Sequence, residues 1–405
     1  MSELIQRVRI QWQSDIGIDL LIDLWKHGNV YVSHVERTKQ GYMPSSNCKW
    51  STKRLDGYFG YNDHLGLYEI SDTLINPLAF TLEATLSVGS PAYCITVAPN
   101  RENFVVGDRS GKVHIGIISR GSFVKAIETG HNRVWTLSYS PHGDRFASGH
   151  EDGTIALWDS NGEQISPPVT AQDWVYTLCF SPDGKYILSG HKQNDPERAN
   201  VRLWTTDPLD HVGSFFHHPS SVTSVRYLPD GTGFISAGRD KSVACVLFDR
   251  NEPLFNQRKH KGTVTYLIMH PIGGIAISGA WTGTVKVWDL QAGDDLRTIE
   301  AHRARITSLA FSPSGRMLAS GGKDSQIAIW QMPECMPLKR TEAHSGWVRG
   351  ICFIDEDTLI SVGSEGTCKI WRLTRRFPIV EKPVEYKSMQ ELLDDYRGPS
   401  DEDDE

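Results

Sequence analysis

Histidine, serine and aspartate recur in this sequence in an order that could support chemistry. His131, Ser148 and Asp152 are the residue types of a serine-hydrolase triad, in which a base activates a hydroxyl and a carboxylate orients the base. Equivalent sets follow further along the chain: His218, Ser236 and Asp240, then His302, Ser320 and Asp324. An enzyme needs one such set, so a set repeated in several segments predicts a structural role.

The same residues can instead link into chains of hydrogen bonds. An indole N–H only donates, a carboxylate only accepts, and a hydroxyl or an imidazole can do both. We therefore expect His131, Ser148, Asp152 and Trp158 to fasten one structural unit internally. The predicted network residues of the other units are His218, Ser236 and Asp240; His260, Ser278 and Trp288; His302, Ser320, Asp324 and Trp330; and His344, Ser361 and Trp371.

Other chemical motifs are weak. The segment Gly107 to Val113 has three residues between its glycines where a phosphate-binding loop has four, and Val113 replaces the Ser or Thr of that motif. The 7 cysteines form no Cys-x-x-Cys pair, and the 15 histidines form no His-Glu-x-x-His motif. The sequence thus predicts no catalytic residue, no metal site and no cofactor, and we expect the protein not to be an enzyme.

These residues lie on a repeated frame. Between Gly130 and Asp159, short alternating runs broken by turn residues predict three antiparallel strands. The proline of the first turn recurs at intervals of 42, 41, 47, 42 and 42 residues, at Pro99, Pro141, Pro182, Pro229, Pro271 and Pro313. The closing aromatic residue of the third strand is assigned to Trp158, Trp204, Phe248, Trp288, Trp330 and Trp371.

A period of this length that carries Gly-His and Trp-Asp resembles the WD-repeat family, over about 290 of the 405 residues. The resemblance implies an all-β fold, a seven-bladed β-propeller of four-stranded blades over residues 78–375. In this family a strand before the first repeat completes the last blade. Residues 80–86 are expected to do so, with Phe377 to Val380 as the alternative. The first blade, from about Thr81 to Ile118, lacks the network residues.

Residues 1–77 do not repeat and are predicted to form a small α/β appendage of the strand-helix-strand type. Val8, Ile10 and Trp12 alternate as in a strand, and Asp15 can cap a helix that extends to about Lys26. A strand pattern resumes from Val30 to Val35, and another runs from Leu65 to Ile70.

The chain is predicted to end in a short amphipathic helix within residues 376–398 and a disordered acidic tail over residues 399–405. Ser388 and Glu391 fit a capping box. The apolar face of this helix consists of Met389, Leu392, Leu393 and Tyr396. It could dock on its own propeller or on a partner.

Charge and composition narrow the classes of function. The net charge of −7 equals the net charge of residues 391–405, so the remainder is neutral and direct nucleic-acid binding is not expected. The sequence has no run of 18 apolar residues and no signal-peptide core, which argues against a membrane association. The scattered cysteines indicate a reducing compartment, so a cytoplasmic location is predicted, with the nucleus as the alternative.

The remaining class is binding. On a WD-repeat propeller, the narrow face around the central channel carries the residues before each first strand and the turn between the second and third strands. In this sequence those positions combine aromatic and basic residues, the types that most often anchor interfaces. The predicted partner-binding residues are Arg133, Trp135, Trp174, Tyr176, Arg239, Trp281, Arg305, Lys323, Trp347 and Arg349.

We therefore expect a non-catalytic scaffold that binds partner proteins in a stable complex, through acidic or phosphorylated segments, without a small-molecule substrate. One alternative is a substrate-recognition subunit of a multi-subunit enzyme such as a ubiquitin ligase. The family signal for that role is an arginine two residues after Trp-Asp, where this chain has Asn161 and Gln291. The other alternative is an enzymatic or effector appendage in residues 1–77.

Overall fold

The computed structural model describes residues 3–11, 19–27, 30–37, 78–193, 195, 200–250, 252–375, 393 and 396. The chain divides into two compact units, Met1–Ile75 and Asn76–Glu405. The predicted strand from Leu65 to Ile70 and the alternative closing strand from Phe377 to Val380 lie outside the described residues.

The first unit contains an antiparallel sheet of three strands in the order β1-β2-β3, namely Glu3–Gln11, Asp19–His27 and Val30–Arg37. The predicted helix is wrong over Asp19–His27, which is a strand and pairs with both neighbours. A short apolar run such as LLIDLW fits a helix face and a strand equally well. Pairing decides the outcome here, because β1 and β3 bond to the backbone groups that a helix would have satisfied internally.

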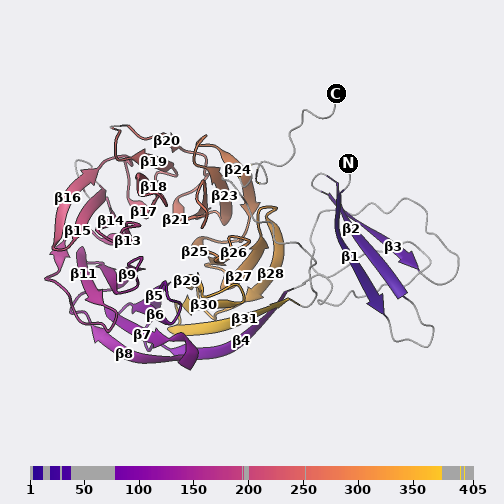
Figure 1. Ribbon diagram of the computed structural model, residues 1–405, viewed down its shortest axis with the longest axis horizontal. Helices are drawn as coiled ribbons and strands as arrows, with labels where there is room; N and C mark the ends of the chain where they lie inside the picture. Colours follow the sequence, from indigo (N-terminus) through magenta and orange to yellow (C-terminus); the bar gives the residue numbers. More distant parts are fainter. Residues whose placement is uncertain are drawn as a thin grey trace. The chain divides into compact units, whose positions relative to one another are not determined.

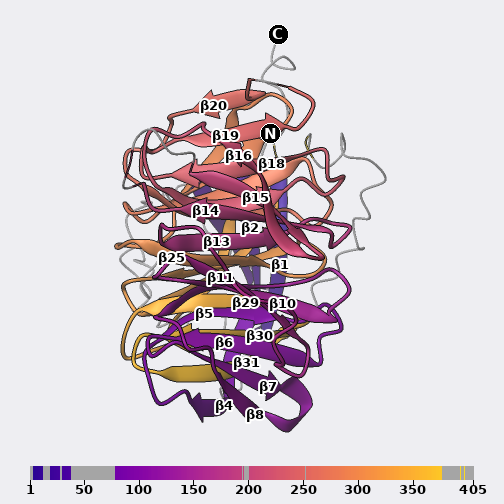
Figure 2. The same cartoon turned by 90° about the vertical axis from the view of Figure 1, so that its left-hand side faces the viewer.

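The second unit is a ring of seven four-stranded antiparallel sheets, or blades, shown face-on in Figure 1 and from the edge in Figure 2. In each of the first six blades the strands follow in chain order from an inner strand at the channel to an outer strand. Blade one consists of β5 (Ala92–Val97), β6 (Asn103–Asp108), β7 (Lys112–Ile117) and β8 (Ser122–Glu128), with a 3₁₀ helix at Ile118–Arg120. Blade two consists of β9 (Val134–Tyr139), β10 (Arg145–His150), β11 (Thr154–Asp159) and β12 (Val169–Thr170).

Blades three to six repeat the same order. Blade three consists of β13 (Val175–Phe180), β14 (Tyr186–His191), β15 (Val201–Thr206) and β16 (Leu209–Phe215). Blade four consists of β17 (Val222–Tyr227), β18 (Gly233–Gly238), β19 (Val243–Leu247) and β20 (Phe255–Gln257). Blade five consists of β21 (Val264–Met269), β22 (Ile275–Ala280), β23 (Thr284–Asp289) and β24 (Asp295–Glu300). Blade six consists of β25 (Ile306–Phe311), β26 (Met317–Gly322), β27 (Gln326–Gln331) and β28 (Met336–Glu342).

The last blade closes the ring with a strand from the start of the unit. Blade seven consists of β29 (Val348–Phe353), β30 (Thr358–Gly363), β31 (Thr367–Arg375) and β4 (Leu78–Ser87). β4 pairs antiparallel with β31 from Leu78 opposite Arg375 to Ser87 opposite Thr367. This pairing places the expected closing strand, residues 80–86, at the outer edge of the blade. It supplies hydrogen-bond partners for the backbone groups along the outer edge of β31.

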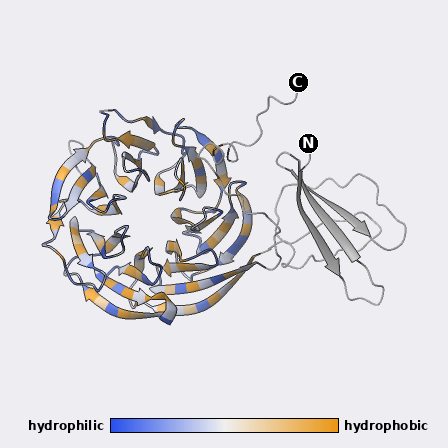
Figure 3. Cartoon of the chain, viewed as in Figure 1, coloured by the Kyte–Doolittle hydropathy of each residue, from blue (hydrophilic) through white to orange (hydrophobic). Residues whose placement is uncertain are grey.

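The core lies between neighbouring blades. Hydrophobic and hydrophilic residues alternate along many strands (Figure 3), and clusters of buried apolar residues join neighbouring blades. In one such cluster, Ile155 and Leu157 of blade two pack with Val175 and Leu178 of blade three. Close approach requires small residues here, because a Cβ on Gly149 would lie 2.6 Å from a methyl carbon of Val175.

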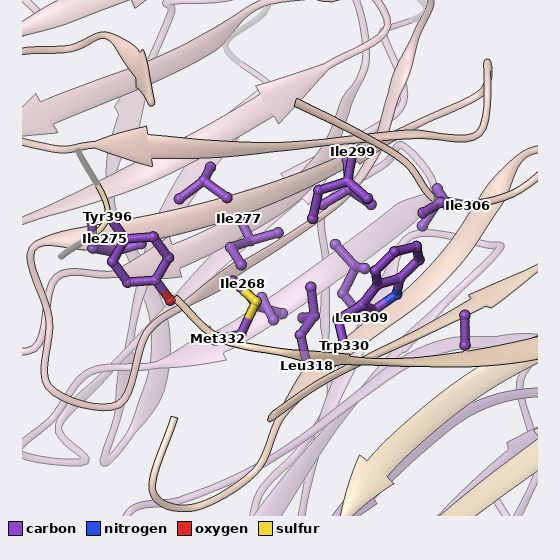
Figure 4. Packing of buried hydrophobic residues seen from close by; sticks show 14 of the residues in the cluster. Ile268, Ile275, Ile277, Ile299, Ile306, Leu309, Leu318, Trp330, Met332 and Tyr396 are labelled. Carbon is purple, nitrogen blue, oxygen red and sulfur yellow. The ribbon is translucent and has the colours of Figure 1, made fainter. Parts of the chain in front are cut away.

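The C-terminal segment contributes to the core between blades five and six. Leu393 and Tyr396 have helical backbone and are 2% and 1% exposed. Tyr396 lies beside Ile275 (Figure 4), and its carbonyl oxygen accepts a hydrogen bond of 3.0 Å from Nε of Arg297. These two residues of the predicted helix face therefore dock on their own propeller, while Met389 and Leu392 lie outside the described residues.

Candidate functional site: the channel-mouth surface

The residues of the predicted hydrogen-bond chains meet inside individual blades. In blade six, Trp330 Nε1 donates to Ser320 Oγ at 3.0 Å, and His302 bonds to Ser320 Oγ at 2.8 Å and to Asp324 at 2.9 Å. In blade seven, Ser361 Oγ lies 2.8 Å from both Trp371 Nε1 and His344 Nε2, and Glu365 takes the place of the aspartate. In blade five, Ser278 Oγ lies 2.7 Å from Trp288 Nε1 and 2.6 Å from His260 Nε2.

Burial excludes these sets from hydrolytic chemistry. Ser148, Ser236, Ser278, Ser320 and Ser361 are each 0% exposed, so no substrate can reach their hydroxyl oxygens. A triad serine must be accessible beside an oxyanion site. The chains hold the second strand, the third strand and the preceding loop together.

Blade two corrects the prediction for His131. Ser148 Oγ bonds to Nε2 of His150 at 2.9 Å and accepts from Trp158 Nε1 at 2.9 Å. His150 is 0% exposed, and its Nδ1 lies 2.9 Å from the carbonyl oxygen of Asn132. His131 is displaced to the surface side, where its ring lies 5.1 Å from that of His150 and its Nδ1 lies 3.4 Å from Asp152.

Blade three uses the same arrangement, with Ser189 between His191 at 2.6 Å and Trp204 at 2.7 Å. Sequence reasoning missed both His150 and His191, although each ends a Ser-Gly-His tripeptide that the other blades lack. In blades two and three, the histidine two residues after the serine occupies the buried position beside the serine hydroxyl. In blades four to seven, the histidine of the loop before the inner strand occupies that position.

In blade four, the predicted closing residue of the third strand, Phe248, is wrong. His218 bonds to Ser236 Oγ at 2.8 Å and to Asp240 at 3.0 Å. Phe234 pairs with Val246, as Phe146 pairs with Trp158 in blade two, so Val246 and not Phe248 stands at the tryptophan position. Phe248 lies beyond β19 and is 39% exposed.

One repeated backbone hydrogen bond defines the narrow face. In every blade the residue after the second strand donates its N–H to the carbonyl of the residue before the inner strand. The seven pairs are Arg109 and Pro91, Glu151 and Arg133, Lys192 and Trp174, Arg239 and Ser221, Trp281 and Thr263, Lys323 and Arg305, and Ser364 and Trp347. We use the term narrow face for these residues and for the second residue of each inner strand: Tyr93, Trp135, Tyr176, Thr223, Thr265, Thr307 and Arg349.

This face brings the ten predicted partner-binding residues to one end of the ring. It also contains Tyr93, Arg109 and Lys192, which the sequence reasoning missed. Tyr93 and Arg109 belong to the degenerate first blade, where aligning Pro91 with Arg133 would have found them. Arginine and lysine account for seven of these positions, and Glu151 is the single carboxylate among them.

Tyr93 lies at the centre of the first group of side chains. The guanidinium carbons of Arg133 and Arg349 lie 4.8 and 4.5 Å from its ring centroid, and Trp135 packs edge-on against it at 5.0 Å. Arg349 also lies 4.4 Å from the ring of Trp347. Aromatic faces therefore hold the guanidinium groups of both arginines.

A second group continues from blade two to blade four. Trp135 stacks on Trp174 at 6.1 Å, and Tyr176 packs edge-on against both rings. Arg239 Nη2 donates to the Tyr176 hydroxyl at 3.0 Å, and Lys192 Nζ lies 4.0 Å above Trp174. Aromatic residues thus form a rigid platform beside the cations.

Blades five to seven complete the ring. Arg305 lies 5.3 Å from the ring of Trp281, and Lys323 Nζ lies 4.3 Å from the ring of Trp347. Trp281 is 56% exposed, the largest exposed fraction among the large hydrophobic residues of the described chain. An indole exposed beside a cation is a ready contact surface.

Most of these cations lack a counter-charge. Arg133 forms an ion pair of 3.2 Å with Glu151, whereas Arg239, Arg305 and Arg349 form none with any described residue. Burial lowers the pKa of Arg349 to about 10, and neighbouring Arg305 and Arg133 act in the same direction. Burial and the nearby Arg239 also lower the pKa of Arg305. Mutual repulsion among arginines is relieved when an anion binds.

The described residues contain no group of three or more His, Cys, Asp or Glu that could hold a metal ion. Among the same residues, no helix is long and apolar enough to cross a membrane. The side chains present at the narrow face are mainly cationic and aromatic.

The closed ring of seven four-stranded blades defines a β-propeller protein. The profile described as "WD domain, G-beta repeat" matches residues 122–159, 166–204, 209–245, 251–289, 293–331 and 335–372. The chain belongs to this WD40 family.

Similar proteins share parts of the propeller. Human apoptotic protease-activating factor 1 is 22% identical over 57% of this chain and 18% of its own length. Eukaryotic translation initiation factor 3 subunit I of Sclerotinia sclerotiorum is 30% identical over 20% of this chain and 24% of its own length. A p21-activated protein kinase-interacting protein 1-like protein of Danio rerio is 29% identical over 23% of this chain and 25% of its own length. The matches thus span a quarter or less of each relative.

Proposed function

We propose that this propeller is a scaffold of a multiprotein complex and that its narrow face binds an acidic or phosphorylated segment of a partner protein. The observation that carries the proposal is the trio Arg239, Arg305 and Arg349, which lie among aromatic rings without a carboxylate partner in the described chain. Guanidinium groups bind carboxylates and phosphates through paired, charge-assisted hydrogen bonds.

Two further observations support the scaffold role. One relative is named as a subunit of an initiation factor, and another as a protein that interacts with a kinase. The described cysteines are free thiols, which suits a complex of the cytoplasm. The ubiquitin-ligase alternative gains no support, since Asn161 and Gln291 stand at the positions of the signal arginine.

A charge-matched pair of variants tests the proposal. Arg239, Lys323, Lys125 and Lys185 are all exposed, so reversing them should leave the fold intact. We expect Arg239→Glu/Lys323→Glu to weaken binding of a fluorescent Glu-Ser repeat peptide, plain or phosphorylated, by about tenfold or more in anisotropy titrations.

The control is Lys125→Glu/Lys185→Glu, which makes the same change in net charge away from the narrow face. Binding to it should change by less than about twofold, because exposed charges further away than the Debye length are screened at physiological salt. Equal losses in both variants would mean that only net charge matters. Unchanged binding by the narrow-face variant would refute the site.

A further inference from the structure

The central channel contains one charged side chain that neither the hydrogen-bond chains nor the narrow face uses. Residues from the inner strands of all seven blades line a cavity of about 310 Å³. Arg226, on β17 of blade four, is the only Arg, Lys, Asp, Glu or His in that lining. Its position is occupied in other blades by small residues such as Ser138, Cys179 and Ala310.

Arg226 is held so that part of its guanidinium remains available. Nη1 donates to the carbonyl oxygen of Val225 at 2.7 Å and to Thr177 Oγ1 of blade three at 3.3 Å. Its Nη2 and Nε donate to no described residue, and no described carboxylate pairs with it. Two N–H groups on one edge of a guanidinium match the two oxygens of a carboxylate.

Tyr266 of blade five forms a platform beside this cation. The guanidinium carbon of Arg226 lies 5.6 Å from the Tyr266 ring centroid, and Tyr266 extends toward Ser308 of blade six. Contacts through Arg226 and Tyr266 therefore link blades three, four, five and six in sequence, each to its neighbour. The pair forms a floor, with the narrow face on one side and the turns after the inner strands on the other.

The groups around Arg226 cannot supply the missing negative charge. Burial raises the pKa of Cys352 to about 12 and also raises the pKa of Cys179 and of Tyr266. These three groups are neutral at physiological pH, so the positive charge of Arg226 is uncompensated within the cavity. A cleft with charge of one sign and low-dielectric walls attracts the opposite charge.

The walls on the far side of this floor are mostly apolar, with Arg101 and Ser312 as the polar residues of the lining. A second cavity of about 320 Å³ shares Val97, Phe311 and Phe353 with the first. It reaches the turns of Pro99, Pro271 and Pro313, at the end of the ring opposite the narrow face. Ligand sites of this size are usually apolar pockets with a few polar groups that fix orientation.

We propose that this part of the channel binds a carboxylate attached to an apolar group, with the carboxylate on Arg226 and the apolar group against Phe311 and Phe353. Two sources share this chemistry: the free C-terminus of a peptide that ends in an apolar residue, and a small apolar carboxylic acid. The site is separate from the narrow face, which a ligand reaches from the other end of the ring.

Calorimetric titration of the full chain with N-acetylleucine, N-acetylleucine amide and 4-methylpentanoate tests the proposal. We expect a carboxylate probe to bind and the amide to bind about tenfold more weakly or not at all, because the amide cannot pair with a guanidinium. Tighter binding of N-acetylleucine points to a peptide C-terminus, and tighter binding of 4-methylpentanoate to a small acid. Equal binding of acid and amide, or no binding at millimolar concentration, overturns the site.

Three variants locate the binding. Arg226→Gln should abolish the preference for the acid over the amide, and Ala310→Leu should block the cavity from blade six while leaving Arg226 in place. Arg239→Gln, on the narrow face, should leave affinity within about twofold, which separates this site from the proposed function. Melting curves check that each variant is folded, and acid binding that survives both cavity variants refutes the proposal.

Discussion

Buried histidines fasten these blades, and their partners differ from blade to blade. In blade six the imidazole bridges Ser320 and Asp324, whereas in blade two His150 bridges Ser148 and a backbone carbonyl. Burial lowers the pKa of His150, so the neutral ring is the form that the native state holds. An imidazole can accept at one nitrogen and donate at the other, which lets either sequence position serve the same serine.

Because His150 and not His131 bonds to Ser148, the two histidines should contribute differently to the stability of blade two. His150→Ala should lower the free energy of unfolding by about 2–4 kcal/mol, because it leaves a cavity and an unpaired carbonyl on Asn132. His131→Ala should cost less than about 1 kcal/mol, since its contact with Asp152 is partly exposed. Urea titration of the two variants gives the comparison. A larger loss for His131 would restore the assignment made from the sequence.

Among the individual strands, some could be predicted from the sequence and others could not. Strands and turns were predictable because Gly and Pro punctuate alternating runs at a nearly constant period. The strand Asp19–His27 was not, because its apolar run is compatible with either secondary structure until pairing partners are known. The assignment of Phe248 failed for a related reason: register, and not residue type, places Val246 opposite Phe234.

Blade five lacks one member of its hydrogen-bond chain, which permits a stabilising substitution. His260 Nδ1 is buried without a hydrogen-bond partner among the described residues, and Thr282 stands where blade six has Asp324. Thr282→Asp should accept from Nδ1 and raise the free energy of unfolding by about 1 kcal/mol at pH 7. Denaturant titration at pH 7 measures this change in the free energy of unfolding. The reverse substitution in blade six, Asp324→Thr, should lower the free energy of unfolding.

The same variant should alter the response to acid. Burial and then Lys286 lower the pKa of His260 to about 4, below its unfolded value near 6.5, so the unfolded chain binds the proton first and stability falls as pH drops from about 6.5 to about 4. An aspartate at residue 282 should raise the pKa of His260 in the folded protein and so reduce the stability that is lost at low pH. Melting temperatures measured from pH 7.5 to pH 4.5 check this, and parallel curves for the two proteins would contradict it.

At the scale of the whole molecule, the ring presents two chemically different ends. The narrow face is a broad surface of cations and aromatic rings, suited to a charged segment of a partner. The opposite end leads to a mostly apolar cavity, which shares Val97, Phe311 and Phe353 with the cavity that Arg226 lines. The residue types of the narrow face were readable from the repeat, because each blade contributes the same positions. The channel floor was not, because Arg226 and Tyr266 differ from the residues at the same strand positions of the other blades, and their contact with each other and with Thr177 depends on how adjacent blades pack.

Ring closure is the property on which both ends depend. β4 pairs with β31 over its whole length, Phe80 stacks on Trp371 at 4.7 Å, and Leu78 is 3% exposed. Without β4, the edge of β31 and the apolar face around Trp371 and Leu373 would be open to solvent. The ring is therefore held by a strand that lies almost 300 residues from its partner.

Two shortened chains test this closure. Residues 78–405 retain β4 and should melt close to the full chain, because they comprise nearly the whole of the second compact unit, Asn76–Glu405. Residues 88–405 lack β4 and should melt about 10 °C lower or more, or self-associate through the edge of β31. Circular dichroism and light scattering distinguish these outcomes. A synthetic peptide of residues 76–89 should restore part of the lost stability, since it can pair with β31 in trans. Equal melting temperatures for the two shortened chains would show that β4 covers the ring without closing it.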